Sequence, residues 1–175
     1  EPEFILMKYN EKGEPVKAID DEPPQGMKMR KQAFGYDVEY SLDSMYFLKE
    51  LIDILGELNW GLHDVVAEGA YSQFELDFHY TNLLEMADRL VFLKILLKEV
   101  AKKHNAFVTF MPKPTIGDWR SGGHINFSLE DIKDGKNVFK DKNSWSKESQ
   151  FAVGGLLTHS EALTAITCPT VNSYN

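Results

Sequence analysis

The chain has 175 residues, of which 43% are apolar and 26% charged, with a formal net charge of −8 and a sequence pI near 5.1. Size and apolar content suit one globular domain, while the acidic balance argues against nucleic acid, because phosphate contacts need clustered Lys and Arg. The lone Cys168 excludes an internal disulfide and no apolar stretch is long enough for a bilayer, so we expect a cytoplasmic protein with no membrane partner.

The first part of the chain is predicted to form a strand, a long loop and a helix. Residues 3–9 have the apolar run of a buried strand, and residues 10–34 form a loop rich in charge, Pro and Gly. Apolar residues at helical spacing predict an amphipathic helix over residues 42–58, with Asn59 placed to end it.

The rest of the chain alternates strands and helices. Strands are predicted at residues 62–67, 73–80, 107–111 and 123–128, and helices at residues 84–104 and 146–166. Because the strands fall mostly in hairpin-like pairs, the sequence predicts an α+β fold with a largely antiparallel sheet and flanking helices.

Two carboxylates begin the chain on one strand face. Residues i and i+2 of a strand point the same way, so Glu1 and Glu3 project together. Two carboxylates on one face repel each other unless a cation lies between them. A solvated strand end at Glu1 is the plainer interpretation.

A second carboxylate pair strengthens the interpretation as a metal site. Glu68 precedes a glycine turn, and Glu75 follows in the strand where Gln73, Glu75 and Asp77 share a face. With His124, the four glutamates would form a site for Mg²⁺ or Mn²⁺, which take carboxylate oxygens and accept imidazole. Spacing alone also fits exposed acidic residues and a structural histidine.

The loop before His124 has features of an anion site. Gly122 and Gly123 let the backbone approach a ligand closely, and Arg120 could form a bidentate contact with a carboxylate or phosphate. The loop is not a P-loop, because the Gly-x4-Gly-Lys-Ser/Thr pattern is absent.

A polar stripe is predicted after this loop. On the expected strand 123–128, the side chains of His124, Asn126 and Ser128 alternate on one face, while Ile125 and Phe127 face the core.

Four runs occur in this order along the chain: EPEF, EGAYSQFELDF, TFMPKPTIGDWRSGGHINFSL and CPTVNSY. Together they resemble the catalytic domain of glutamine synthetase and its γ-glutamyl-amide ligase relatives, over nearly the whole chain. The run QFELDFHY resembles the branch that includes γ-glutamylmethylamide and γ-glutamylanilide synthetases. The resemblance implies a curved antiparallel sheet and only part of that domain, with a β-grasp domain preceding residue 1 and the phosphate-clamping arginines following residue 175.

The resemblance also implies roles for the five candidate ligands. Glu3, Glu68 and Glu75 would hold one of two divalent cations, and Glu1 and His124 would hold the other, which bridges the phosphates of ATP. The expected cofactors are thus two Mg²⁺ or Mn²⁺ ions, with ATP as a substrate.

The remaining roles concern ATP and glutamate. Asn126 and Ser128 would bind ATP, and the stretch with Trp119, Arg120 and Gly122 would bind L-glutamate. The implied reaction transfers the ATP γ-phosphate to the side chain of glutamate, after which ammonia or a small amine attacks the acyl phosphate. The resemblance further implies homo-oligomeric decamer or dodecamer rings.

Two departures from the family pattern bear on function. The family usually has Asn-Gly-Ser-Gly before the histidine, where this chain has Trp119, Arg120, Ser121 and Gly122. Asn126 stands where ammonia-using enzymes carry a second histidine, and the amine-using relatives often have asparagine there as well.

An active γ-glutamyl ligase is the first hypothesis for this chain. A catalytically silent structural or regulatory member of the same fold is the second, and an unrelated acidic binding domain is the third.

Overall fold

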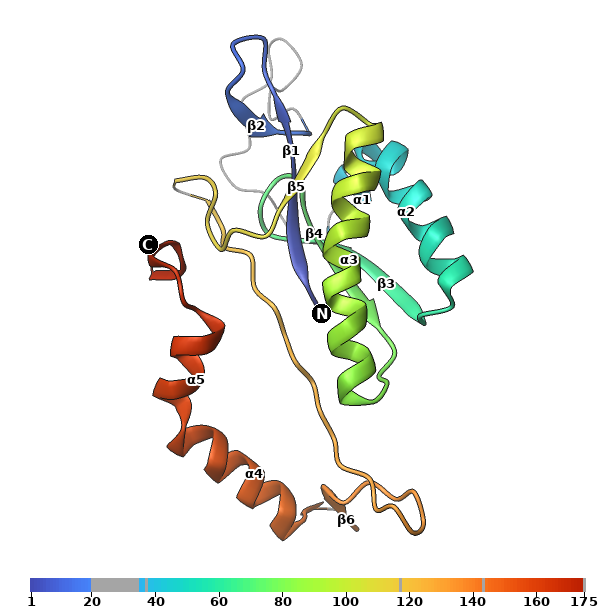
Figure 1. The fold of residues 1–175 in the computed structure, drawn as a ribbon, viewed down its shortest axis with the longest axis vertical. Helices are drawn as coiled ribbons and strands as arrows, with labels where there is room; N and C mark the ends of the chain where they lie inside the picture. Colours follow the sequence, from blue (N-terminus) through green and yellow to red (C-terminus); the bar gives the residue numbers. More distant parts are fainter. Residues whose placement is uncertain (20–34, 37, 117, 143, 175) are drawn as a thin grey trace. The chain divides into compact units, whose positions relative to one another are not determined.

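The computed structural model describes residues 1–19, 35–36, 38–116, 118–142 and 144–174 (Figure 1). These divide into two compact units, Glu1–His124 and Ile125–Asn175. None of the helices in the described ranges combines the length and apolar character that crossing a membrane requires.

An antiparallel sheet built around β1 (Glu3–Tyr9) forms the first unit. β1 pairs with β2 (Pro15–Lys17), β4 (Gln73–Phe78) and β5 (Phe107–Thr109), and β3 (Leu62–Ala67) pairs with β4. The predicted strands 3–9 and 62–67 are confirmed with the same bounds.

The predicted loop 10–34 is wrong in one place, because β2 lies within it. Residues 15–17 pair with the end of β1, and Asn10 closes the turn between the two strands through its side-chain oxygen, which accepts hydrogen bonds from the amides of Lys12 and Glu14. Residues 20–34 of that loop lie outside the described residues.

Three helices belong to this unit, α1 (Val38–Asp43), α2 (Met45–Leu58) and α3 (Leu83–Lys103). The predicted single helix 42–58 is wrong at its start, because Ser44, with φ −100° and ψ 4°, separates α1 from α2. Its end is confirmed, since Asn59 adopts a left-handed conformation with φ 53°.

The core lies on one face of the sheet, where α2 and α3 pack (Figure 1). Strand residues Phe4, Leu6, Phe74 and Leu76 contribute to it and are fully buried. Alternation then turns Glu3, Gln73 and Glu75 to the opposite face. This frame positions the candidate site.

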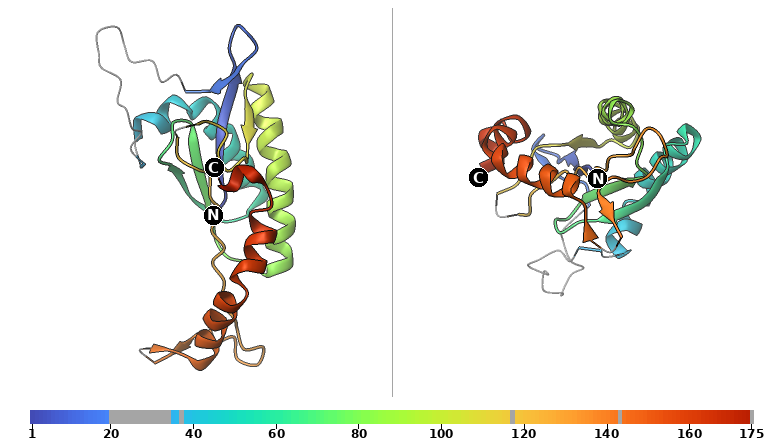
Figure 2. Two further views of the ribbon diagram at one scale, coloured as in Figure 1. Left: turned by 90° about the vertical axis from the view of Figure 1, so that its left-hand side faces the viewer. Right: turned by 90° about the horizontal axis from the view of Figure 1, so that it is seen from below.

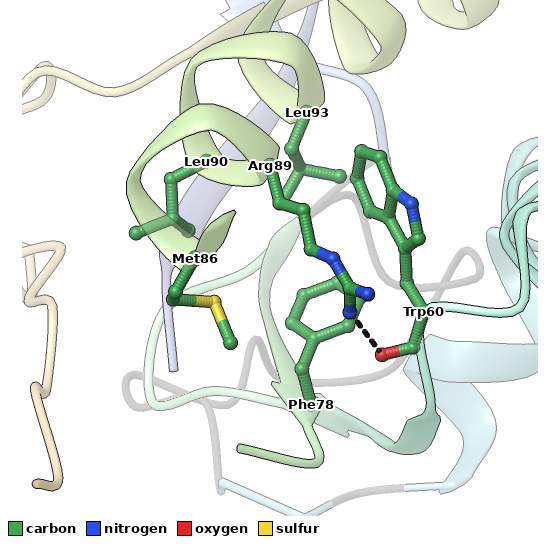
Figure 3. Close-up of a pocket in the computed structure, with 6 residues that line it drawn as sticks. All are labelled: Trp60, Phe78, Met86, Arg89, Leu90 and Leu93. Carbon is green, nitrogen blue, oxygen red and sulfur yellow. Dashed lines mark hydrogen bonds between the residues drawn. The ribbon is translucent and has the colours of Figure 1, made fainter. Parts of the chain in front are cut away.

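Arg89 anchors α3 to Trp60, which lies between α2 and β3. Its guanidinium group lies 5.6 Å from the Trp60 ring centroid and donates a hydrogen bond of 3.1 Å to the Trp60 carbonyl oxygen. Figure 3 shows this bond beside the other residues that line a small pocket, namely Phe78, Met86, Leu90 and Leu93.

The second unit has a short hairpin, β6 (Lys140–Asp141) and β7 (Ser144–Trp145), two helices, α4 (Lys147–Thr158) and α5 (Ser160–Thr167), and a 3₁₀ turn, Val171–Tyr174. Figure 2 shows α4 and α5 as consecutive helices, coloured orange to red. The predicted continuous helix 146–166 is wrong, because His159, with φ −103° and ψ 14°, interrupts it.

The predicted strand 123–128 is also wrong. Gly123 forms one isolated bridge with Pro2, and no ladder follows it over residues 124–128. Ile125 and Phe127, which were predicted to face a core, are 75% and 51% exposed. An alternating pattern makes a strand only when a second strand is available to pair with it.

Candidate functional site

Backbone pairing brings distant segments together at the start of β1. In the β1–β4 ladder, Glu3 lies opposite Glu75. The bridge between Pro2 and Gly123 then places His124 beside Glu1, whose carbonyl oxygen accepts a hydrogen bond of 3.0 Å from the His124 amide.

Glu1, Glu75 and His124 form the centre of the candidate site. The Nδ1 atom of His124 lies 3.2 Å from Oε1 of Glu75 and 3.4 Å from Oε2 of Glu1. One ligating atom from each of the three residues lies within 4.8 Å of the others. The Glu75 side chain is only 12% exposed, whereas that of His124 is 60% exposed, so the cluster is open on one side.

Glu68 extends this negative charge. Burial raises the pKa of Glu68, and a hydrogen bond with the neighbouring Glu75 carboxylate raises it further. The hydrogen bond to Glu75 raises the pKa of His124, and the charges of Glu75, Glu3 and Glu1 add to that effect. Electrostatically, the cluster therefore favours a bound positive charge, either a proton or a metal ion.

The donor set fits a hard divalent cation. Carboxylate oxygens and one imidazole nitrogen suit Mg²⁺ or Mn²⁺. Two oxygen ligands of one ion, each about 2.0–2.6 Å away from it, lie at most about 5 Å apart. The separations of up to 4.8 Å among Glu1, Glu75 and His124 meet that limit. Glu75 adjoins both His124 and Glu68, and the division of the five ligands between two ions stays a prediction.

Glu3 is held against the loop that precedes His124. Its Oε2 accepts a hydrogen bond of 2.8 Å from the Gly122 amide, and the Glu3 amide donates one of 3.4 Å to the Gly122 carbonyl oxygen. A Cβ atom on Gly122 would lie 2.8 Å from Oε1 of Glu3. A side chain at this position would therefore require the Glu3 carboxylate to shift, a reason for glycine that residue type alone does not indicate.

Gln73 is a site residue that the sequence analysis missed. It was predicted to share a face with Glu75, and it is 2% exposed. Its Nε2 donates to Oε2 of Glu3 at 2.7 Å and to the carbonyl oxygen of Arg120 at 3.0 Å, while its Oε1 accepts from the Ala70 amide at 3.1 Å. A glutamine two residues before a ligand candidate, on the same strand face, was the only signal in the sequence.

The loop carries Trp119 over the turn between β3 and β4. A Cβ atom on Gly69 would lie 2.8 Å from Cδ2 of the Trp119 ring, so the indole lies directly on the glycine backbone. Asp118 forms an ion pair with Lys17 of β2, and that ammonium group lies 5.5 Å from the Tyr71 ring centroid. The indole thus lies against the residue that follows Glu68, although it remains 61% exposed.

The other predicted ligand-binding residues are exposed. Arg120 presents its backbone carbonyl to Gln73, and its side chain is exposed. Asn126 and Ser128 are exposed members of the second unit, outside any strand. Their roles in binding glutamate and ATP stay predictions.

Comparison with known proteins identifies the family. The model of the glutamine synthetase catalytic domain matches residues 1–175. The chain belongs to the glutamine synthetase family. It is 38% identical to the glutamine synthetase of Pyrococcus abyssi, in a match that covers 99% of this chain and 36% of the relative. It is 46% identical to the glutamine synthetase of Pyrococcus furiosus, in a match that covers 59% of this chain and 23% of the relative.

Solved structures agree with this membership. GmaS in a complex with ADP superposes with a TM-score of 0.79 at 28% identity, covering 99% of this chain and 38% of the GmaS chain. GmaS without ligand gives 0.76 at 27% identity, covering 98% and 39%. This glutamine synthetase family chain thus spans little more than a third of the length of these relatives.

Proposed function

We propose that this chain is part of an ATP-dependent ligase that joins ammonia or an amine to the γ-carboxylate of glutamate. The observation that carries the proposal is the cluster of Glu1, Glu75 and His124, whose ligating atoms lie within 4.8 Å of one another in a chain that matches the family model throughout. The similarity to GmaS supports an ATP-using ligase of this fold.

The proposed reaction has two steps. An oxygen of the glutamate γ-carboxylate attacks the γ-phosphorus of ATP, ADP leaves, and an acyl phosphate forms. The amine nitrogen then attacks the acyl carbon, inorganic phosphate leaves, and the nitrogen loses a proton. Divalent cations supply charge neutralisation for the phosphoryl group when they are bound.

The residues of this chain would hold those cations and position the substrates. Glu3, Glu68 and Glu75 would bind one ion, and Glu1 and His124 would bind the other, with Glu75 close enough to both to be shared. Two ions are the arrangement that we propose.

Arg120 would bind glutamate through its guanidinium group, and Gly122, whose amide already donates to Glu3, would let the loop backbone approach the substrate closely. Asn126 and Ser128 would contact ATP. The parent protein would act as a homo-oligomer.

We further propose that the acceptor is an amine larger than ammonia. The Trp119 indole lies on Gly69, directly after Glu68, and gives that edge of the site an apolar wall. The run QFELDFHY, which resembles the γ-glutamylmethylamide and γ-glutamylanilide synthetase branch, supports an amine acceptor. If kcat/KM of the full-length protein is higher for ammonia than for methylamine and ethylamine, and Trp119→Asn leaves the ranking unchanged, the amine proposal is wrong.

An assay of the full-length parent protein tests the ligase itself. With Mg²⁺, ATP, glutamate and hydroxylamine, the acyl phosphate should be trapped as γ-glutamyl hydroxamate, and the yield should match ADP release. The 175-residue chain alone should give no product, because it spans about a third of its relatives. A full-length protein that binds ATP but forms neither the hydroxamate with hydroxylamine nor an amide with ammonia or an amine would be a silent member of the fold.

A further inference from the structure

We propose that Gln73 is a positioning residue that holds the Glu3 carboxylate and the loop Asp118–Gly123 together as one unit. The inference rests on the proposed function, in which Glu3 binds a cation and the loop binds glutamate. It concerns a residue that contacts neither a cation nor glutamate itself. Gln73 lies opposite Ile5 in the β1–β4 ladder, and its side chain lies between Glu3 and the loop.

The Gln73 amide group has a fixed orientation. It is 2% exposed, and both of its functional atoms are engaged, Nε2 with Glu3 and Arg120 and Oε1 with Ala70. Two donors and one acceptor bond hold a buried amide in a single orientation, because turning it by 180° would face Nε2 toward the Ala70 amide and Oε1 toward two acceptors. The orientation follows from the turn before β4, so it needs no ligand.

The first consequence concerns which oxygen Glu3 presents. Oε2 accepts one hydrogen bond from Gln73 at 2.7 Å and one from the Gly122 amide at 2.8 Å. With Oε2 engaged twice, Oε1 is the oxygen that Glu3 offers to a cation. Gln73 therefore orients the carboxylate before the cation arrives, as polar neighbours of metal ligands commonly do.

The second consequence concerns the loop. Gln73 holds the carbonyl oxygen of Arg120, the Glu3 backbone and side chain hold Gly122, and the Asp118 end is held separately by Lys17. The Nε2 atom of Gln73 thus contacts both the carboxylate and the loop. If the amide is removed, the Glu3 carboxylate loses the hydrogen bond from Nε2, and the loop loses the bond that Nε2 donates to the Arg120 carbonyl oxygen.

A purely structural role would give a different result. A buried glutamine that only stabilises β4 would change unfolding but would leave cation binding and the loop of the folded protein unchanged. Leu76→Ala provides the matched control, because Leu76 is fully buried in the apolar core, on the opposite face of the same strand from Gln73. Its effects report what loss of strand packing alone does.

The test uses the full-length parent protein and two variants. Gln73→Met keeps the length of the side chain without its hydrogen bonds, and Gln73→Asn keeps the amide but withdraws it by about one carbon–carbon bond, about 1.5 Å. If the methionine variant does not fold, the asparagine variant carries the test. Mn²⁺ alone is titrated and followed by electron paramagnetic resonance, and hydrogen exchange of the Asp118–Gly123 peptide is measured without metal.

We expect the Gln73 variants to bind Mn²⁺ about 10-fold to 100-fold more weakly, the usual effect of losing such a neighbour of a metal ligand. Hydrogen exchange in the loop should rise without metal, and KM for glutamate should rise more than KM for ATP. Leu76→Ala should leave all three nearly unchanged. Variants with wild-type Mn²⁺ binding and loop exchange, or a Leu76→Ala protein with the same losses, would overturn the proposal.

Failure of the proposed function would look different. A wild-type protein that binds no Mn²⁺ and makes no amide would remove the ligase proposal itself. A wild-type protein that does both, with Gln73 variants that behave like it, would leave the ligase proposal intact and remove only the role of Gln73.

Discussion

Phe74 of β4 is 0% exposed and its ring lies 5.9 Å from that of Phe4, whereas Phe151 of α4 is 74% exposed. The burial of each phenylalanine is typical of the unit to which it belongs. The first unit buries apolar residues from four strands and two helices, while among the described residues of the second unit only Ser146 and Ser149 are buried. The carboxylate cluster is therefore built on a packed frame, whereas Asn126 and Ser128 lie in a unit whose described apolar side chains are exposed or half-buried.

The largest expected effect is a direct test of this difference. Phe74→Ala should lower the free energy of unfolding by about 3–5 kcal/mol, because it removes a buried ring and leaves a cavity. Phe151→Ala in the same chain should change it by less than about 0.5 kcal/mol, as for an exposed site. Urea unfolding of the 175-residue chain measures both, and equal losses would show that the two units are packed alike.

The N-caps of α3 and α4 offer a second comparison of the two units, because both caps have a well-formed side-chain hydrogen bond. Asn82 begins α3 and accepts a hydrogen bond of 3.0 Å from the Glu85 amide, and Ser146 begins α4 and accepts one of 3.1 Å from the Ser149 amide. Asn82→Ala and Ser146→Ala should each cost about 1 kcal/mol of helix stability. Thermal melts followed by circular dichroism would contradict this if only the α3 variant were affected.

The smallest expected effect is electrostatic and depends on pH. A hydrogen bond from Lys103, then one from His104, lowers the pKa of Glu50 and ties α2 to α3. A carboxylate whose pKa is lower in the folded than in the unfolded state stabilises the folded protein at pH values above its unfolded pKa, about 4.3. This stabilisation is lost as the pH falls through the folded-state pKa. Glu50→Gln should therefore be less stable than wild type at pH 7 and equal to it in acid.

Asp134 of the second unit is the control for that experiment. A hydrogen bond from Lys136 lowers its pKa as well, but the two residues are only two positions apart and tie no helices together. Asp134→Asn should therefore change unfolding less than Glu50→Gln at pH 7. The opposite order would mean that the Glu50 contact does not stabilise the packing of α2 on α3.

The sequence pattern predicted well where local chemistry and packing agree. The strand bounds 3–9 and 62–67 were confirmed because their apolar residues are also the ones that the sheet buries or pairs. The helix predicted at 42–58 ended correctly at Asn59, whose left-handed backbone is a local property. In these places the nearest residues already determine the structure.

Prediction failed where the structure of a segment depends on pairing with a distant part of the chain. The alternation of Ile125 and Phe127 suggested a strand, but no ladder forms over residues 124–128. The same limit applies at the site. Glu1, Glu75 and His124 could be named from residue type, yet the contact between Gln73, Glu3 and Arg120 depends on a loop more than forty residues away in the chain.

The central claim is that the cluster around Glu75 holds a divalent cation, and Mn²⁺ binding by the full-length protein tests it most directly. Glu75→Gln replaces the carboxylate that adjoins both His124 and Glu68, and Glu57→Gln removes an exposed carboxylate of α2 as the control. Titration followed by electron paramagnetic resonance should show at least about 10-fold weaker binding for Glu75→Gln and unchanged binding for Glu57→Gln. Equal Mn²⁺ affinity in wild type and Glu75→Gln would contradict the account.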